Sequence, residues 1–309
     1  MLDYFYLGLY HALRFLVKIA PKCVLKGFLK SLASAFYHLD KKHTNIMRVN
    51  LKMCFAALKD DEIERLIKKN YYNFALFGAE FLLNQNTTKE QILSKISFEN
   101  EELFNSVLSQ NRPIIVQTAH YGNWELFSLA MAARYGAVSI IGRALDSAKM
   151  NEILSANRTR FDIELIDKKS AVKQALKALN NRRLLGILVD QNTAKNEGLE
   201  CEFFSHKIMH THAASVFASK SGAIIIPAFI ERNENKDKSK DNSKDDSFKI
   251  VFYEPIDMQV LSQNHSKEEA LRLATQAQSD ATAAQISKKP DEYFWMHKKF
   301  KCFYENSYA

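Results

Sequence analysis

A histidine and a glutamate stand where an apolar run meets a helical pattern. His120 follows the apolar run 113–116, which has the composition of a strand covered on both faces, and Glu125 falls in the first turn of a predicted helix. An imidazole takes a proton from an alcohol when one ring nitrogen is free and a carboxylate bonded to the other ring nitrogen fixes the tautomer. The pattern predicts a general base, His120, oriented by Glu125.

The surrounding stretch, QTAHYGNWELF, also contains Gly122, which would let the backbone approach a substrate closely. The spacing of His120 and Glu125, taken alone, is better explained by a structural histidine beside a capped helix. The position favours chemistry, because ligands bind at the carboxyl ends of strands in open α/β sheets.

Strands and helices alternate along most of the chain. Strands are predicted at 113–119, 137–143, 163–167, 183–191, 223–232 and 248–256, and helices at 40–57, 61–84, 146–161, 170–181, 211–222 and 267–287. Gly222 is expected to cap the helix that it ends. The polar segment 233–246 is interpreted as the solvated tip of a hairpin. This alternation predicts an α/β domain with a mixed, mostly parallel central sheet flanked by helices.

The first 38 residues combine apolar stripes with basic faces, and Pro21 separates the two predicted helices. They lack the basic start and cleavage site of a signal peptide, and no apolar run reaches the ~18 residues of a membrane span. Two such helices are typical of an interfacial membrane anchor. We therefore expect 1–38 to be membrane-anchoring helices and 39–309 to be the catalytic domain, although two ordinary packed amphipathic helices are the alternative.

The composition and net charge of the chain limit the classes of partner that it could bind. Hydrophobic residues make up 47% of the 309 residues, which excludes wholesale disorder, and the net charge of +8 indicates an acidic partner such as anionic lipid, phosphate groups, nucleic acid or an acidic protein. The lysines are not interleaved with aromatic residues in a recognisable nucleic-acid motif, which speaks against nucleic acid. The four cysteines form no CxxC pair and are expected to be reduced.

A cluster of histidines downstream raises the question of a metal. His206, His210 and His212 lie close together after Cys201, but the glutamate of a His-Glu-x-x-His zinc site is missing. The small-residue helix predicted from 211 favours helix-cap and core roles for these side chains. We expect no metal and no cofactor.

The stretch HYGNWE resembles the signature of the lysophospholipid-type acyltransferases, and more specifically of the lipid A biosynthesis late acyltransferases. Further segments follow in the order of that family, and the resemblance covers roughly 112–301. These segments are IIGRAL with Arg143, SANRTRF with Asn157 and Arg158, GILVDQN with Asp190 and Gln191, and the closing block PDEYFWMHKKFK. The chain departs from the family pattern at Val189, which replaces proline, at Ser205, which replaces glycine, and at the lysine pair 298–299, which replaces two arginines.

The resemblance implies a glycerolipid acyltransferase-like fold and an O-acyltransferase of lipopolysaccharide biosynthesis. The donor would be an acyl carrier protein thioester, or acyl-CoA, and the acceptor a hydroxyl on the hydroxyacyl chain of a lipid A precursor. The enzyme would work at the cytoplasmic face of the inner membrane, peripherally or anchored by its N-terminus. His120 would deprotonate the hydroxyl, and Glu125 would orient His120.

The resemblance also implies a set of substrate-binding residues. Backbone N–H groups near Gly122 and Asn123, or the Arg158 guanidinium, would bind the oxyanion, and Arg143 would bind an acceptor phosphate. The full set is Gly122, Asn123, Arg143, Arg158, Asp190 and Gln191. Arg143 could instead form a surface salt bridge, and Asp190 could cap a helix or bind an arginine.

Other functions remain open at this point. An acyltransferase acting on another glycolipid or a glycerophospholipid shares the same motif. A membrane-binding or nucleic-acid-binding module without catalysis, and a zinc hydrolase built on the histidine cluster, are alternatives of a different class.

Overall fold

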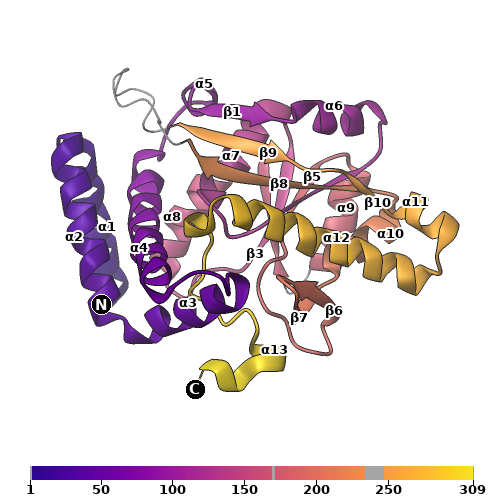
Figure 1. The fold of residues 1–309 in the computed structure, drawn as a ribbon. Helices are drawn as coiled ribbons and strands as arrows, with labels where there is room; N and C mark the ends of the chain where they lie inside the picture. The colour runs from indigo at the N-terminus through magenta and orange to yellow at the C-terminus, as the bar shows by residue number, and fades with distance from the viewer. Residues whose placement is uncertain (1, 169–170, 234–246, 309) are drawn as a thin grey trace.

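The computed structural model describes residues 2–168, 171–233 and 247–308. One eight-stranded sheet forms the centre of the molecule, with helices on both faces and a helical N-terminal region at one side (Figure 1). The predicted hairpin tip at 233–246 lies, except for residue 233, outside the described residues.

Strand order places the ends of β2 and β5 side by side. The sheet runs β1-β9-β8-β2-β5-β3-β4, and β10 pairs with β8. Its strands are β1 (Ile96–Glu99), β2 (Ile114–Thr118), β3 (Val138–Gly142), β4 (Ile163–Asp167), β5 (Leu184–Leu188), β8 (Ile224–Arg232), β9 (Phe248–Phe252) and β10 (Ile256–Asp257). Only the β8–β9 and β8–β10 pairs are antiparallel, so the predicted mixed, mostly parallel sheet is confirmed. A separate hairpin joins β6 (Gly198–Phe203) to β7 (His206–Thr211).

The helices surround this sheet. They are α1 (Leu2–Ile19), α2 (Lys22–Leu39), α3 (Lys41–Cys54), α4 (Asp60–Leu83), α5 (Lys89–Leu93), α6 (Glu101–Ser109), α7 (Trp124–Tyr135), α8 (Ala148–Arg158), α9 (Ala171–Asn180), α10 (Ala213–Ser221), α11 (Met258–Asn264), α12 (Lys267–Lys288) and α13 (Lys301–Tyr304). Gly222 caps α10 with φ +69°, as expected. The helices and strands predicted from periodicity are therefore confirmed within the described residues, with ends shifted by a few positions.

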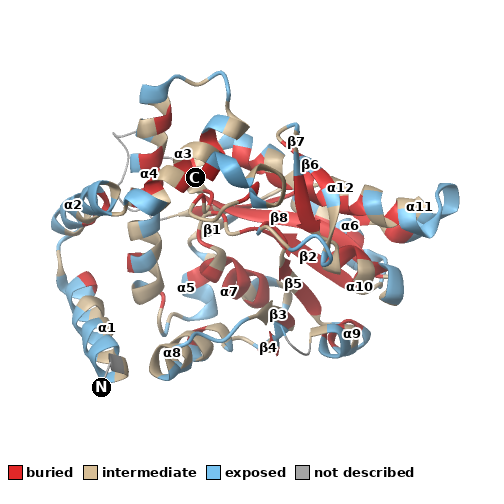
Figure 2. Cartoon of the chain, turned by 90° about the horizontal axis from the view of Figure 1, so that it is seen from below, coloured by how far each residue is buried: buried red, intermediate tan, exposed pale blue. Residues whose placement is uncertain are grey.

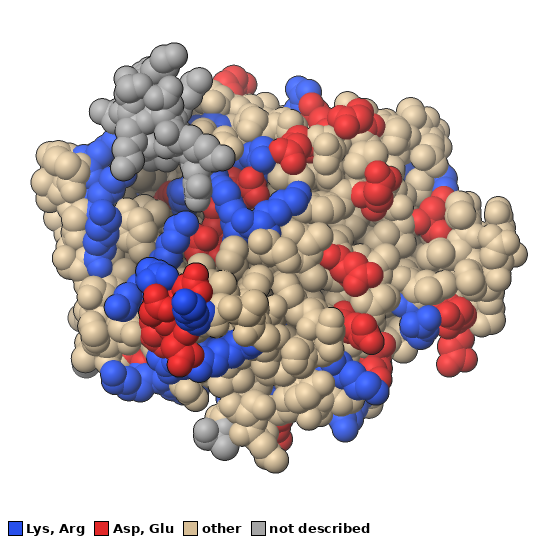
Figure 3. All heavy atoms as spheres, in the orientation of Figure 1, with Lys and Arg blue, Asp and Glu red and all other residues tan. Residues whose placement is uncertain are grey.

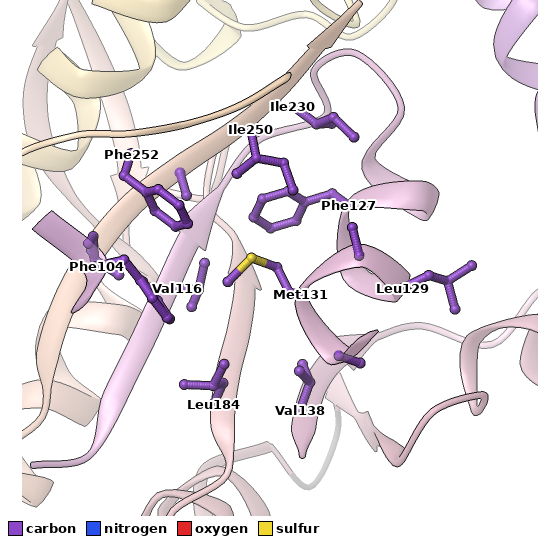
Figure 4. Close-up of a cluster of buried hydrophobic side chains, with 14 of the residues drawn as sticks. Phe104, Val116, Phe127, Leu129, Met131, Val138, Leu184, Ile230, Ile250 and Phe252 are labelled. Atoms are coloured by element: carbon purple, nitrogen blue, oxygen red, sulfur yellow. The ribbon is translucent and has the colours of Figure 1, made fainter. Parts of the chain in front are cut away.

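Strand β2 is buried along its whole length because helices cover both faces of the sheet. On one face Phe127 and Met131 of α7 belong to the same buried cluster as Val116 of β2 and Phe252 of β9 (Figure 4). On the other face, residues of α9, α10 and α12 form a second cluster with β5 and β8. Burial of each such large side chain contributes about 1.5–3 kcal/mol. The start of α7, and with it the loop that carries His120, is held firmly against the sheet.

The N-terminal helices pack on α4 but leave much apolar surface open. Val17 and Leu29 meet Ala79 in a small cluster of their own. Most of α1 and α2 is exposed or half-buried (Figure 2), including Phe15 at 63% and Phe28 at 52%. No helix among the described residues is both long and apolar enough to cross a bilayer. The two predicted helices are confirmed, and their membrane binding stays a prediction.

Candidate active site

The imidazole of His120 pairs with Asp190. Nδ1 of His120 lies 2.9 Å from Oδ1 of Asp190, and since a carboxylate only accepts, Nδ1 carries the proton. The Asp190 side chain is fully buried, whereas the His120 side chain is 24% exposed. Among the described residues Nε2 of His120 has no hydrogen-bond partner. That nitrogen is therefore free to accept a proton from a bound hydroxyl.

The prediction that Glu125 orients His120 is wrong in its geometry. Both carboxylate oxygens of Glu125 accept from Arg158, Oε2 from Nε at 2.9 Å and Oε1 from Nη2 at 2.5 Å. Glu125 occupies the first turn of α7 as expected, and Arg158 ends α8. The orienting carboxylate comes instead from the end of β5, because β5 lies beside β2 in the sheet. Glu125 remains close enough for its charge to act on His120.

The charges around the pair raise the pKa of His120 and lower the pKa of Asp190. Burial disfavours a charged His120, but the charge and hydrogen bond of Asp190, with help from Glu125, outweigh it and raise the pKa of His120 above 6.5. Burial of Asp190 likewise opposes ionisation, yet His120, with His297 and Lys299 further away, holds the pKa of Asp190 well below its usual range. The lowered pKa favours the ionised form of Asp190.

The loop between β2 and α7 is held by the closing block of the chain. The N–H of Gly122 donates to the carbonyl of Glu292 at 2.9 Å, and the N–H of Phe294 donates to the carbonyl of His120 at 2.9 Å. The predicted use of the Gly122 N–H as an oxyanion donor is therefore wrong, because this group is already engaged. Gly122 matters for its conformation, with φ at +56°.

Gly122→Ala is expected to lower the free energy of unfolding by about 2–5 kcal/mol. An added Cβ would stand 2.0 Å from the carbonyl oxygen of Ile230, and the positive φ disfavours any side chain. Gly78→Ala on α4 is the matched control, since nothing lies within 4 Å of its Cβ and alanine is the better helix former. Urea unfolding of both variants measures the difference, and an unchanged midpoint for Gly122→Ala would contradict it.

Asn123 serves the helix that follows it. Its Oδ1 accepts from the N–H of Leu126 at 3.0 Å as the N-cap of α7, and its Nδ2 donates to Glu80 of α4 at 2.8 Å. The side chain is buried and both of its ends are engaged. Asn123 therefore ties the start of α7 to α4, and its backbone N–H is the part left for the predicted oxyanion role.

Arg143 and Gln191 lie at the exposed edge of the site. Arg143, just after β3, is 78% exposed and pairs with Asp146 at 2.7 Å, the surface salt bridge anticipated as its alternative role. Such exposed pairs contribute little to stability. Gln191 follows Asp190 and is exposed. The structure thus brings His120, Asp190, Glu125 and Arg158 together and leaves Arg143 and Gln191 outside that cluster.

An aromatic surface lies beside His120. The rings of Trp124 and Phe294 lie 5.3 and 6.1 Å from the His120 ring, and Phe77 of α4 stacks on Trp124 at 4.2 Å. Together with Phe74 these rings line a pocket next to Gly122. Trp124 and Phe294 belong to the segments HYGNWE and PDEYFWMHKKFK, and Phe74 and Phe77 to the apolar segment 70–83, which is hydrophobic nearly all round. The His120 ring therefore lies beside aromatic surface.

The histidine cluster is divided between a hairpin and a helix start, and the predicted helix-cap and core positions are found for His212 and His210. His206 and His210 lie in β7, where each Nδ1 lies 2.8 Å from a main-chain carbonyl, and His212 precedes α10. Burial lowers the pKa of His210 to about 3. Within 2–168, 171–233 and 247–308, no group of three or more His, Cys, Asp or Glu side chains is placed to hold a metal ion.

Comparison with known proteins points to one family. Residues 1–302 match the family model for bacterial lipid A biosynthesis acyltransferases. The lipid A biosynthesis lauroyltransferase of Escherichia coli (strain K12) is 19% identical over 270 residues, which cover 84% of this chain and 80% of that protein. The lipid A biosynthesis palmitoleoyltransferase of the same strain is 20% identical over 280 residues, 90% of this chain and 84% of that protein. Because the family model spans nearly the whole chain, this protein belongs to the bacterial lipid A biosynthesis acyltransferase family and is an acyltransferase.

Proposed function

We propose that this protein transfers a fatty acyl chain from an acyl carrier protein thioester to a hydroxyl on the hydroxyacyl chain of a lipid A precursor. The observation that carries the proposal is the His120–Asp190 pair, whose imidazole ring lies 5.3 Å from the Trp124 ring. Acylating a hydroxyl needs a base and a place for hydrocarbon, and it needs no metal. Family membership supplies lipid A as the pathway.

The reaction begins when Nε2 of His120 takes the hydroxyl proton as the oxygen attacks the thioester carbon. Asp190 accepts a hydrogen bond from Nδ1 and stabilises the imidazolium that forms. The C–O bond forms, the tetrahedral oxyanion collapses, and the C–S bond breaks. The proton held by His120 then passes to the departing thiolate, which balances the step.

The oxyanion needs hydrogen-bond donors, and each one contributes about 2.7–4 kcal/mol to lowering the barrier. Two N–H groups of Arg158 are spent on Glu125, and its Nη1 has no hydrogen-bond partner among the described residues. Arg158 through Nη1 and the backbone N–H of Asn123 are the donors we propose. Glu125 then acts by holding Arg158 and by adding negative charge near His120. Arg143 and Gln191 are proposed to meet the acceptor headgroup at the exposed edge.

The acidic carrier protein fits the charge of this chain. The formal net charge is +8, and on the face seen in Figure 3 most of the Lys and Arg side chains lie in the left half of the view, around one compact group of carboxylates, while other carboxylates are scattered over the right half. A positive field speeds encounter with an acidic protein or an anionic bilayer. We place residues 1–38 on the cytoplasmic face of the inner membrane and residues 39–309 above it as the acyltransferase domain.

Phe15→Glu combined with Phe28→Glu is expected to weaken vesicle binding at least ten-fold. The two exposed rings lie on α1 and α2, and a carboxylate placed there opposes insertion into an anionic interface. Val260→Glu on α11, which is 54% exposed at the opposite side of the molecule, is the matched control (Figure 1). Sedimentation with phosphatidylglycerol–phosphatidylethanolamine vesicles measures the effect. Equal binding by the parent protein, the double variant and the control would contradict the membrane role of α1 and α2.

The direct test is an assay of purified protein with acyl carrier protein thioesters of several chain lengths and a lipid A precursor. We expect mass spectrometry to show a precursor heavier by one acyl chain, with the loss of one thioester per product. A lysophospholipid acceptor and an acyl-CoA donor run in parallel. Acylation of the lysophospholipid without any acylation of the lipid A precursor would overturn the proposal.

The pH profile of kcat/KM is expected to fall on the acid side through a pKa above 6.5. His120 works as a base only when neutral, and Asp190 raises its pKa, so activity is lost as the pH drops below that raised value and is regained above it. Initial rates between pH 5.5 and 8.5 measure this fall in kcat/KM at acid pH. A flat profile across that interval would contradict His120 as the base.

A further inference from the structure

The closing block of the chain touches both halves of the catalytic pair. We call residues 290–299 the closing strap. Its Glu292 and Phe294 exchange main-chain hydrogen bonds with Gly122 and His120, each at 2.9 Å. At its other end the ammonium of Lys299 donates to the main-chain carbonyl of Asp190. His120 follows β2 and Asp190 follows β5, so the strap bridges the two strand ends that form the pair.

The strap is itself held from the N-terminal side. The Nδ2 group of Asn50 on α3 donates to the carbonyls of Trp295 and His297, both at 2.8 Å. The Nδ2 group of Asn70 on α4 donates in the same way to the carbonyls of Asp291 and Tyr293, at 2.8 and 2.7 Å. Each amide thus grips two alternate carbonyls. These four hydrogen bonds hold the main chain of the strap in place, and Lys299 extends to Asp190 from the end of that segment.

Lys299 is an unusual residue to find in this place. Its side chain is only 1% exposed, its ammonium lies 4.7 Å from the centre of the Phe203 ring, and the Asp190 carbonyl is its one hydrogen-bond partner among the described residues. Burying a cation is expensive unless nearby groups compensate. The Oδ2 atom of Asp190 is buried as well, without a partner in the part of the chain that the structure describes. A buried cation therefore binds the main chain of the residue whose buried carboxylate contacts the imidazole.

We propose that Lys299 is a positioning residue of the active site: it holds the segment that carries Asp190 so that Oδ1 stays on Nδ1 of His120. The kinetic part of this inference rests on the proposed function. The structural part rests on contacts alone.

The charged groups around Lys299 decide whether its removal raises or lowers the pKa of His120. Asp190, Cys54 and Cys201 face Lys299, and burial lowers the pKa of Lys299 to about 8, which the charge of Asp190 opposes. His210 and His297, which also face it, are buried and have pKa values lowered to about 3 and about 4. Near neutral pH these two histidines are uncharged, and Lys299 is the cation behind Asp190.

The charges facing His120 come from Asp190, Glu125 and Arg158. If Lys299 holds Asp190 in place, its loss loosens the hydrogen bond that raises the pKa of His120, and that pKa falls. If Lys299 acts only as a distant positive charge, its loss raises the pKa of His120 instead. The two roles thus predict opposite shifts.

The experiment is an NMR titration of the ¹⁵N-labelled His120 imidazole in the full chain, in Lys299→Met and in Lys298→Met. Lys298 is the matched control: it is the adjacent lysine, and its ammonium lies over the Tyr308 ring at 5.5 Å rather than on Asp190. We expect the pKa of His120 to fall by about half a unit or more in Lys299→Met and to stay unchanged in Lys298→Met. We also expect kcat to fall at least ten-fold in Lys299→Met with KM within three-fold. Thermal melts report the folded fraction, and Lys299→Gln takes the same titration if Lys299→Met is too unstable.

A rise, or no change, in the pKa of His120 in the lysine variant would overturn the inference, as would a kcat within two-fold of the parent. The titration needs no substrate, so it decides the role of Lys299 even if the reaction is different from the one proposed. Activity that survived the loss of His120 would remove the proposed function and leave the titration result standing.

Discussion

His120→Ala is expected to lower kcat by about 10²- to 10⁴-fold. Nδ1 of the imidazole contacts a fully buried carboxylate, and among the described residues its Nε2 has no hydrogen-bond partner. Without it, the hydroxyl must attack while still protonated, or lose its proton to water. Arg158 and the Asn123 backbone still bind the oxyanion, so a residual rate above the uncatalysed reaction is expected.

A companion variant separates chemistry from folding. Removing His120 leaves the Asp190 carboxylate buried without its partner, which destabilises the fold. The amide nitrogen of His120→Asn can still donate toward Asp190, as Nδ1 does, but it cannot act as a base. We expect both variants to be equally inactive and His120→Asn to melt at the higher temperature. More than a tenth of the parent kcat in a folded His120→Asn protein would rule out the general-base role.

Sequence reasoning predicted Glu125 as the carboxylate that contacts His120, whereas the structure places Asp190 there, and the reason is physical. Glu125 was the candidate because it is local to His120, whereas Asp190 is seventy positions further on. What brings Asp190 close is the pairing of β2 with β5, in which Ile115 lies opposite Leu185. Strand order depends on how the whole sheet assembles, and periodicity within each segment does not report it. Asp190 was still named as a site residue, from the segment that resembles the family.

The fold was predictable where the local signal was strong. Strand β4 and helix α12 show clear patterns and were found. The hairpin β6–β7 was missed because its turn, Phe204 and Ser205, adopts positive φ at both residues without a glycine or asparagine to reveal it. The four-residue strand β1 was also missed, because four residues are too few to show an alternation. Local rules therefore fail at short elements and at strained turns.

The contacts that hold His120 and Asp190 in place could not be predicted from the spacing of residues in the sequence. The closing block stood out only through its resemblance to a family, and its hydrogen bonds to His120 and Asp190 join residues more than a hundred positions apart. The amides of Asn50 and Asn70 that hold it lie more than two hundred positions away. A search for buried asparagines in the apolar faces of 40–57 and 61–84 would have marked both as residues needing partners.

Asp190→Asn is expected to lower kcat by about 10²- to 10⁴-fold, the loss typical of replacing the aspartate of a catalytic triad by its amide. The side chain keeps its shape but loses its charge, so the imidazolium formed during the reaction is no longer stabilised. The pKa of His120 should fall at the same time, because the charge and hydrogen bond of Asp190 are what raise it against burial. The acid limb of kcat/KM should therefore move to lower pH.

Glu125→Gln is the matched comparison, since it makes the same chemical change in the neighbouring carboxylate. Its amide oxygen can still accept from Arg158, and so we expect only about a ten-fold loss of kcat and a smaller shift of the acid limb. Steady-state kinetics across the pH range place the two variants on one scale. The ranking is the decisive result, because a larger loss in Glu125→Gln than in Asp190→Asn would mean that Glu125 orients His120 during turnover and that the pairing seen between His120 and Asp190 is not the one the enzyme uses.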